Sequence, residues 1–87
     1  IVYSLQPAYP NPFNPKTTIR YELPRTDVVT ISVYDLNGRL VERLMNAPQQ
    51  AGRHQISWDA GRFASGVYLV KMQSSDFQSV QKVMLMK

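Results

Sequence analysis

Short segments in which apolar and polar residues alternate constrain this chain more than any other feature of its sequence. Within Thr17–Leu23, for example, Ile19 and Tyr21 alternate with Arg20 and Glu22. A period of two is typical of a β-strand with one buried and one solvated face. No segment shows a convincing helical period, so we predict a chain built from β-strands.

Turn-forming residues divide the chain into about seven such segments. Pro24 ends one segment, Pro48 and Gly52 bracket a polar loop, and Gly61–Gly66 and Ser74–Asp76 separate later segments. The expected strands are Tyr3–Gln6, Thr17–Leu23, Val28–Asp35, Arg39–Met45, Gly52–Asp59, Val67–Gln73 and Phe77–Lys87. So many short strands in 87 residues predict an all-β fold, an antiparallel β-sandwich.

Three local expectations follow from this pattern. Asn37-Gly38 predicts a hairpin with a type I′ turn, in which both residues have positive φ. Leu40–Met45 also fits a helical spacing, but the preceding hairpin signal favours a strand. Val67–Gln73 is apolar on both faces for much of its length, as in a central strand. The core is expected to contain Ile31, Val33, Trp58, Val67 and Leu69.

Composition limits the classes of protein to consider. At 87 residues the chain forms one domain at most. Ten Lys and Arg against six Asp and Glu give a net charge of +4, but the basic residues are dispersed from Lys16 to Lys87. This dispersion argues against a nucleic-acid interface. It is explained by solvated strand faces, and the net positive charge only weakly favours contact with anionic surfaces. The chain has no cysteine and no apolar stretch of the roughly 20 residues that span a bilayer.

The residues do not assemble into a catalytic or metal site. His54 is the single histidine and shares a strand face with Ile56 and Trp58, which predicts a packed or edge histidine. Without a second histidine or a cysteine, no zinc site is expected. Asp35 and Asp59 each end a strand, where a carboxylate usually accepts turn amides. We therefore expect no enzyme activity and no cofactor.

The aromatic residues leave one alternative open. Tyr21, Tyr34, Trp58 and Tyr68 lie on expected strands, and a β-sandwich can present such side chains as a platform for sugars. A carbohydrate-binding accessory module of a secreted glycoside hydrolase is therefore an alternative. It requires Trp58 or two tyrosines on an exposed face. The competing interpretation places Trp58 in the core, with the tyrosine hydroxyls at its rim.

The run Tyr9-Pro10-Asn11-Pro12-Phe13-Asn14-Pro15 holds three of the six prolines. Proline fixes φ and disfavours the helical region for the residue before it. Asparagine tolerates turn conformations. The run therefore predicts a rigid segment that precedes the strand Thr17–Leu23, and we expect Phe13 to staple this segment onto the sandwich.

Several blocks in a fixed order resemble a known family. They are Tyr-Pro-Asn-Pro-Phe-Asn-Pro, Thr-Thr-Ile-Arg-Tyr-Glu-Leu-Pro, Val-Tyr-Asp-Leu-Asn-Gly-Arg-Leu-Val, Ala-Gly-Arg-His-Gln-Ile-Ser-Trp-Asp, Ala-Ser-Gly-Val-Tyr-Leu-Val-Lys and Lys-Val-Met-Leu-Met-Lys. Together they resemble the type A C-terminal sorting domain of the type IX (Por) secretion system of Bacteroidetes-related bacteria. The resemblance covers Leu5–Lys87. The immunoglobulin-like module of flagellar hook-capping proteins is similar, so a structural or assembly module is a further alternative.

The resemblance implies a fold, partners and recognition residues. It implies an immunoglobulin-like sandwich fused behind an N-terminal cargo, exported to the medium or cell surface without membrane insertion. The implied partners are an outer-membrane translocon and a sortase-like protease that removes the domain after export. The recognition residues that the resemblance assigns are Pro10, Asn11, Pro12, Phe13, Gly66, Tyr68, Lys82 and Lys87.

Two further expectations concern the ends of the chain. The start Ile1-Val2-Tyr3, without an initiator methionine, predicts that residues 1–87 are one domain cut from a longer protein. The end at Lys87, directly after an apolar strand, predicts a natural C-terminus. If this last strand is a sheet edge, its unpaired amides are available for strand addition by a partner.

Overall fold

The described chain consists of strands and the segments that connect them. The computed structural model describes residues 2–87, and no helix occurs within that range. The segment that also fitted a helical spacing, Leu40–Met45, is a strand. The strands are β1 (Ser4–Leu5), β2 (Lys16–Leu23), β3 (Asp27–Tyr34), β4 (Leu40–Gln49), β5 (Gly52–Asp59), β6 (Gly66–Ser74) and β7 (Phe77–Leu85).

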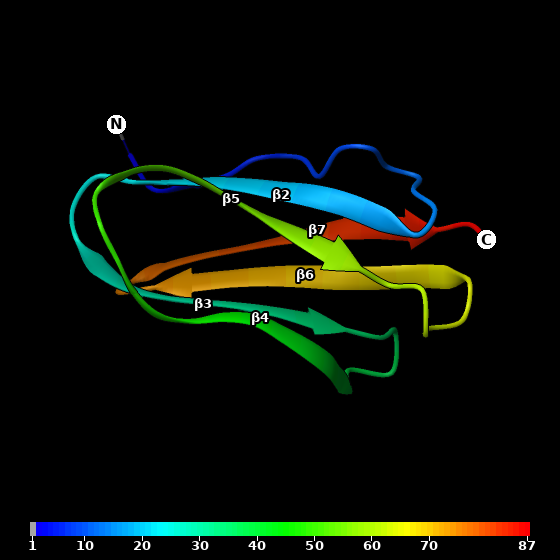
Figure 1. Ribbon diagram of the computed structural model, residues 1–87. Coiled ribbons are helices and arrows are strands. Elements are labelled where there is room, and N and C mark those ends of the chain that lie inside the picture. Colours follow the sequence, from blue (N-terminus) through cyan, green and yellow to red (C-terminus); the bar gives the residue numbers. More distant parts are fainter. Residues whose placement is uncertain (1) are drawn as a thin grey trace.

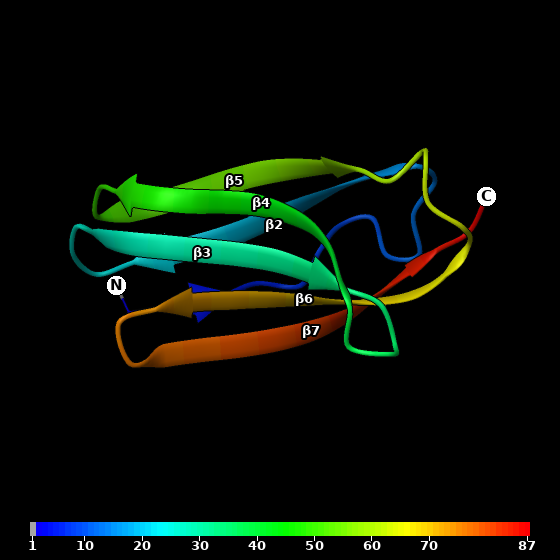
Figure 2. The same cartoon turned by 90° about the horizontal axis from the view of Figure 1, so that it is seen from below.

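These strands form two antiparallel sheets that pack face to face (Figure 1 and Figure 2). One sheet has the order β1-β2-β5 and the other the order β4-β3-β6-β7. β6 lies between β3 and β7, in agreement with its prediction as a central strand. The arrangement confirms the predicted all-β sandwich and is consistent with its immunoglobulin-like class.

The core lies between the two sheets, where alternate residues of each strand point inward. On β6 the prediction was wrong, because Val67 and Leu69 are half-buried on the outer face of the sheet. Since β6 is apolar on both faces, alternation along it does not reveal which set points inward. The buried apolar residues are Ala8, Phe13, Ile19, Tyr21, Leu23, Val29, Ile31, Val33, Trp58, Ala60, Tyr68, Val70, Met72, Val83 and Leu85.

The turn between β3 and β4 differs from the predicted type I′ turn. Only Gly38 has a positive φ in this turn, at 82°. Its amide donates to the carbonyl of Asp35, and the amide of Asp35 donates to the carbonyl of Arg39, both at 3.0 Å. The Asp35 carboxylate accepts the amides of Asn37 and Arg39 at 2.9 and 3.0 Å. This carboxylate therefore stabilises a longer loop that needs the left-handed conformation at the glycine alone.

β4 is longer and less regular than expected. It continues to Gln49, and Pro48, which was predicted to lie in a loop, pairs opposite Val28. Proline is tolerated there because β4 is an edge strand. Two register shifts against β3 bring Val41 and Leu44 against the core. The bulges replace strict alternation in β4, which explains why its sequence also fitted a helical spacing.

The two ends of the sandwich carry different parts of the chain. The described chain begins at one end, here called the N-terminal pole, and finishes at Lys87 at the other, the C-terminal pole (Figure 1 and Figure 2). The loops at residues 9–15, 35–39 and 60–65 lie at the C-terminal pole. The molecule measures 37 × 23 × 16 Å along its principal axes, and its long axis runs between the two poles (Figure 1).

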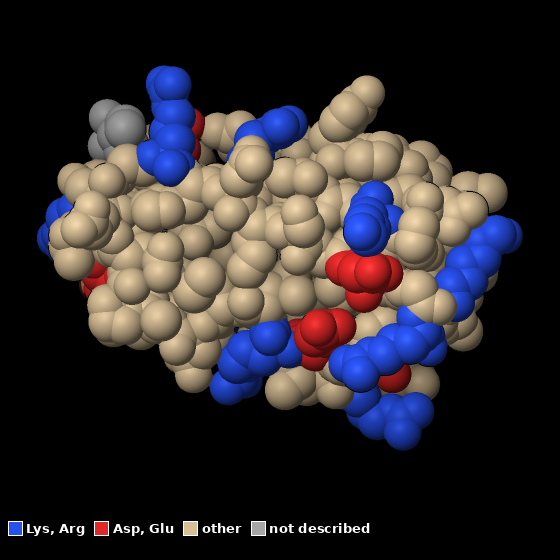
Figure 3. All heavy atoms as spheres, in the orientation of Figure 1, with Lys and Arg blue, Asp and Glu red and all other residues tan. Residues whose placement is uncertain are grey.

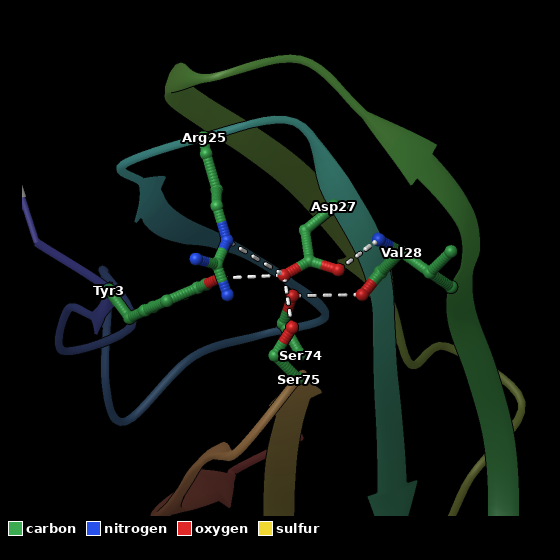
Figure 4. A network of polar contacts seen from close by, with 6 residues as sticks. All are labelled: Tyr3, Arg25, Asp27, Val28, Ser74 and Ser75. Atoms are coloured by element: carbon green, nitrogen blue, oxygen red, sulfur yellow. Dashed lines mark hydrogen bonds and ion pairs between the residues drawn. The ribbon is translucent and has the colours of Figure 1, made fainter.

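A network around Asp27 fixes the start of the chain at the N-terminal pole (Figure 4). Its Oδ2 accepts the hydroxyl of Tyr3 at 2.6 Å and that of Ser75, and lies 3.9 Å from Nε of Arg25. Its Oδ1 accepts the amide of Val28 at 2.9 Å. The Ser75 hydroxyl, then that of Tyr3, lowers the pKa of Asp27 from its ordinary value of 3.8.

Candidate recognition site at the C-terminal pole

The proline-rich segment of residues 9–15 connects β1 and β2 of one sheet and contacts the edge of β7 in the other sheet on the way. Tyr9 exchanges two backbone hydrogen bonds with Thr18 of β2, at 3.1 and 3.0 Å. The carbonyl of Pro10 then accepts the hydroxyl of the buried Thr17 at 2.7 Å. All three X–Pro peptide bonds of the segment are cis. The segment is thus fixed to β2 on one side while its middle extends toward β7.

The middle of the segment pairs with the outer edge of β7. The amide of Phe13 donates to the carbonyl of Met84, and its carbonyl accepts the amide of Met86, both at 2.9 Å. The side chain of Asn11 bonds the same edge: Nδ2 donates to the carbonyl of Lys82 at 3.1 Å, and Oδ1 accepts the amide of Met84 at 2.9 Å. Asn11 and Phe13 therefore serve as a short parallel strand beside the end of β7.

Gln81 extends this pairing toward the start of the chain. Its Oε1 accepts the amide of Ala8, and its Nε2 donates to the carbonyl of Gln6, both at 2.7 Å. β7 is an edge strand, but Asn11 and Phe13 cover its edge at Lys82, Met84 and Met86. Contrary to the expectation, the amides of Met84 and Met86 are therefore not free for strand addition. Strand alternation carries no information on such a long-range contact.

An aromatic cluster holds the C-terminal pole together. Trp58 is fully buried, and its ring centroid lies 5.5 Å from that of Phe13, 5.9 Å from that of Phe63 and 5.5 Å from that of Tyr68. The Trp58 indole donates to Oε1 of Glu42 at 3.0 Å. Phe13 therefore staples the proline-rich segment onto the sandwich, as expected. Phe13 and Tyr68 meet on one buried tryptophan.

The Gly66-Val67-Tyr68 sequence forms the corner that leads into β6. The hydroxyl of Tyr68 donates to the carbonyl of Ala64 at 2.6 Å. This bond matches the tyrosine corner of immunoglobulin-like sandwiches, in which a tyrosine near a strand's start bonds the backbone just upstream. Gly66 has φ of 154°, a conformation that residues with a side chain rarely adopt. The glycine permits the bend, and the tyrosine fixes it.

The two lysines near the end of the chain, Lys82 and Lys87, have different environments. The Lys87 ammonium donates to the carbonyl of Gly61, and its amide donates to the hydroxyl of Ser65 at 3.0 Å. These bonds tie the last residue to the loop before β6. The Lys82 side chain is exposed and forms no ion pair within residues 2–87. Lys87 therefore closes the pole, whereas Lys82 faces solvent.

A shallow hollow of about 360 Å³ lies between the start of β6 and the end of β7. Met84 and Met86 line it with exposed fractions of 40% and 54%. Ser65, Gly66, Val67, Leu85 and Lys87 complete the lining. Flexible thioether side chains adapt to varied apolar partners, so this hollow suits an apolar side chain.

The structure divides the eight predicted recognition residues into two sets. Phe13 and Tyr68 are buried, and their side chains organise the pole from inside. The exposed set comprises Pro10, Asn11, Pro12, Gly66, Lys82 and Lys87. Gln81 was missed, although a polar residue in register with the inward-facing Val83 and Leu85 was a detectable signal. Ser65 and Gly61 were also missed, and no sequence pattern identifies them as partners of Lys87.

The contacts of His54 and Trp58 are those of residues that stabilise the fold. The ring of His54 stacks on Tyr21, and its Nε2 lies 2.7 Å from the carbonyl oxygen of Gln50 at an edge strand. This confirms the packed histidine.

Trp58 is buried and so is not available to a sugar platform. Tyr9 is the one tyrosine that is exposed in residues 2–87, so two exposed tyrosines are not present there. Residues 2–87 contain no cluster of three or more metal-ligating side chains and no helix that is long and apolar enough to cross a membrane.

Charged side chains lie beside one another on the face in Figure 3. Basic and acidic groups are interspersed there, and a broad uncharged area occupies much of the rest of the face. Residues 2–87 contain four ion pairs, of which Arg53 with Glu22 at 3.5 Å and Arg62 with Glu42 at 3.8 Å join segments distant in the sequence. The charges on this face do not form a stripe of one sign.

The chain belongs to the family of secretion-system C-terminal sorting domains. The family profile matches residues 7–86, nearly the whole chain. The matched range contains the proline-rich segment, the tyrosine corner and β7. Membership identifies the chain as a C-terminal sorting signal of the type IX system. No curated protein sequence matches it.

Proposed function

We propose that this domain directs the export of a protein fused to its N-terminus through the type IX outer-membrane translocon to the cell surface or the medium. The family match over residues 7–86 carries this proposal. The domain acts by binding, not by catalysis, and needs no cofactor. Residues 1–87 function as one unit, and the cargo precedes them.

The separation of the two poles supports this role. A cargo joined before Tyr3 leaves the sandwich at the N-terminal pole, where the Asp27 network holds the chain (Figure 4). The exposed recognition residues lie toward the opposite end of the long axis, which measures 37 Å. A folded cargo therefore leaves the C-terminal pole free to contact the translocon.

The division of the recognition residues supports a composite surface. Phe13 and Tyr68 fix the geometry from within the core, while Pro10, Asn11, Gly66 and Lys82 stand at the surface. These surface residues come from the proline-rich segment, β6 and β7, three segments that contact one another at the C-terminal pole. The translocon therefore recognises the folded domain and not a linear peptide.

Removal of the domain by a sortase-like protease completes the proposal. Proteases cleave extended, accessible segments in preference to hydrogen-bonded strands. Tyr3 already donates a hydrogen bond to Asp27, and residues 4–9 pair along β2. The cleaved bond therefore precedes Tyr3, in the connection to the cargo.

A reporter fusion tests the export function. In a bacterium with a type IX system, a periplasmic reporter that carries residues 1–87 at its C-terminus is expected outside the cell, and the unfused reporter is expected in the periplasm. Deletion of residues 82–87 is a poor test, because it also removes the buried Val83 and Leu85. Periplasmic retention of a fusion whose sorting domain is folded would contradict the proposal.

A further inference from the structure

The outer face of the four-stranded sheet carries a group of partly exposed apolar side chains. Leu40, Tyr34 and Leu69 occupy adjacent positions across β4, β3 and β6. Val67 and Met84 follow in the next row of β6 and β7. Leu40 is 48% exposed and Met84 is 40% exposed. These side chains continue directly into the hollow at the C-terminal pole.

Three cations border this apolar group. Arg43 and Lys71 lie on either side of Ser32 in one row of the sheet, and Lys82 lies opposite Leu69 at the β7 edge. None of the three forms an ion pair within residues 2–87. The outward positions of these four strands hold no Asp or Glu, since the Glu42 carboxylate bonds the buried Trp58. The face therefore has a charge of one sign.

The outer face of the other sheet is different. Its outward positions on β2 and β5 are polar, with Thr18, Arg20, Gln55 and Ser57 among them. Arg53 on that face pairs with Glu22 at 3.5 Å. The sandwich thus has one polar face with charges of both signs and one face that combines apolar groups with cations alone.

We propose that the outer patch, defined as Tyr34, Leu69 and Met84 with Arg43, Lys71 and Lys82, docks on an acidic surface of a protein of the export machinery. This inference rests on the proposed function and names the chemistry of the partner. An apolar centre that contains a tyrosine, with charges at its rim, is the usual composition of a protein interface. Unpaired cations at that rim require carboxylates on the partner for complementarity.

Charge reversal of the outer patch tests the surface. In the reporter fusion, the double variant Lys71→Glu/Lys82→Glu is compared with Lys16→Glu/Arg20→Glu, which changes the net charge equally on the exposed positions of β2. We expect the first to lower export by about tenfold or more, because like charges across an interface cost several kcal/mol. We expect the second to export normally. Circular dichroism of both purified variants verifies the fold.

Carboxylate contact is tested with a zero-length carbodiimide, which joins amines to carboxylates that touch them. During export by cells made permeable to the reagent, the wild-type fusion is expected to give a cross-linked species that the double variant Lys71→Arg/Lys82→Arg lacks. Arginine keeps the positive charge but is not coupled to carboxylates by the reagent, so loss of the cross-linked species in this variant locates the contact at these lysines. A cross-linked species that persists unchanged in this variant would contradict contact at these lysines.

Vesicles distinguish a protein partner from an anionic membrane. The purified domain is expected not to sediment with vesicles of equal phosphatidylcholine and phosphatidylglycerol at physiological salt. Sedimentation that is lost in Lys71→Glu/Lys82→Glu would assign the patch to lipid and overturn the protein partner.

The export experiment separates this inference from the proposed function. If the wild-type fusion is exported and both charge-reversed variants export equally, the docking role of the patch is overturned while the proposed function stands. If the wild-type fusion is not exported, the proposed function itself fails.

Discussion

The ring of Phe13 packs against that of Trp58 with 5.5 Å between their centroids. Phe13 also pairs through its backbone with the edge of β7, and Trp58 belongs to β5 in the opposite sheet. Phe13 thus connects the two sheets at the C-terminal pole, because its backbone contacts β7 and its ring contacts β5. Stability of the core and presentation of the terminal strand are therefore linked.

Phe13→Ala is expected to lower the free energy of unfolding by about 3–5 kcal/mol, the usual cost of truncating a buried phenylalanine. That loss is a large part of the total stability of a small domain. Urea denaturation monitored by Trp58 fluorescence measures it. Tyr9→Ala is the matched control, since Tyr9 is 70% exposed in the same segment. A loss for Phe13→Ala no larger than that of the control would show that the staple is not a core contact.

Tyr68→Phe removes one hydroxyl and leaves the carbonyl of Ala64 without its partner. The expected loss of stability is about 1–2 kcal/mol, as for other part-buried hydrogen bonds. Tyr34→Phe is the control, because the Tyr34 hydroxyl makes no hydrogen bond within residues 2–87. Urea denaturation gives the unfolding midpoint of each variant. Equal midpoints for the two variants would argue against a tyrosine corner.

Asn11→Ala is expected to loosen the edge of β7 without unfolding the sandwich. The amide of Met84 donates to Oδ1 of Asn11, so its hydrogen exchange should accelerate by about fivefold, which corresponds to ~1 kcal/mol. The amide of Ile31, on the interior strand β3, serves as the internal reference. Unchanged exchange at Met84 would mean that the asparagine does not protect this edge.

Acid is expected to destabilise the N-terminal pole through Asp27. The folded-state pKa of Asp27 lies below its ordinary value of 3.8, because the hydroxyls of Ser75 and Tyr3 stabilise the carboxylate. A depressed pKa contributes stability above the unfolded-state value, and this contribution is lost as the pH falls through the folded-state value. The stability of Asp27→Asn should therefore decline less than that of wild type below about pH 4. Parallel pH profiles for both proteins would contradict this role.

The strand content and the class of fold were predictable because alternation and turn residues are local signals. Local signals failed where a partner strand decides the outcome. The bulges of β4 arise from its register with β3, and the inward set of β6 depends on its pairing with β7. The β3–β4 turn took a longer form because the Asp35 carboxylate offers the amides of Asn37 and Arg39 an acceptor.

The candidate site was predictable as a set of motifs but not as an arrangement. Phe13 was expected to staple its segment, yet no local pattern places it beside Met84 and Met86. Lys82 and Lys87 look equivalent in sequence, but the Lys87 ammonium bonds the carbonyl of Gly61, whereas Lys82 remains exposed. Long-range contacts made these distinctions.

The most direct test of the sorting function compares one reporter fusion in two isogenic strains of a type IX host, with and without the outer-membrane translocon. The measured quantity is the fraction of a periplasmic reporter, carrying residues 1–87 at its C-terminus, that reaches the cell surface or the medium. We predict that most of it does so in the complete strain and that it remains in the periplasm without the translocon. Equal fractions outside both strains would contradict the account, as would retention in both.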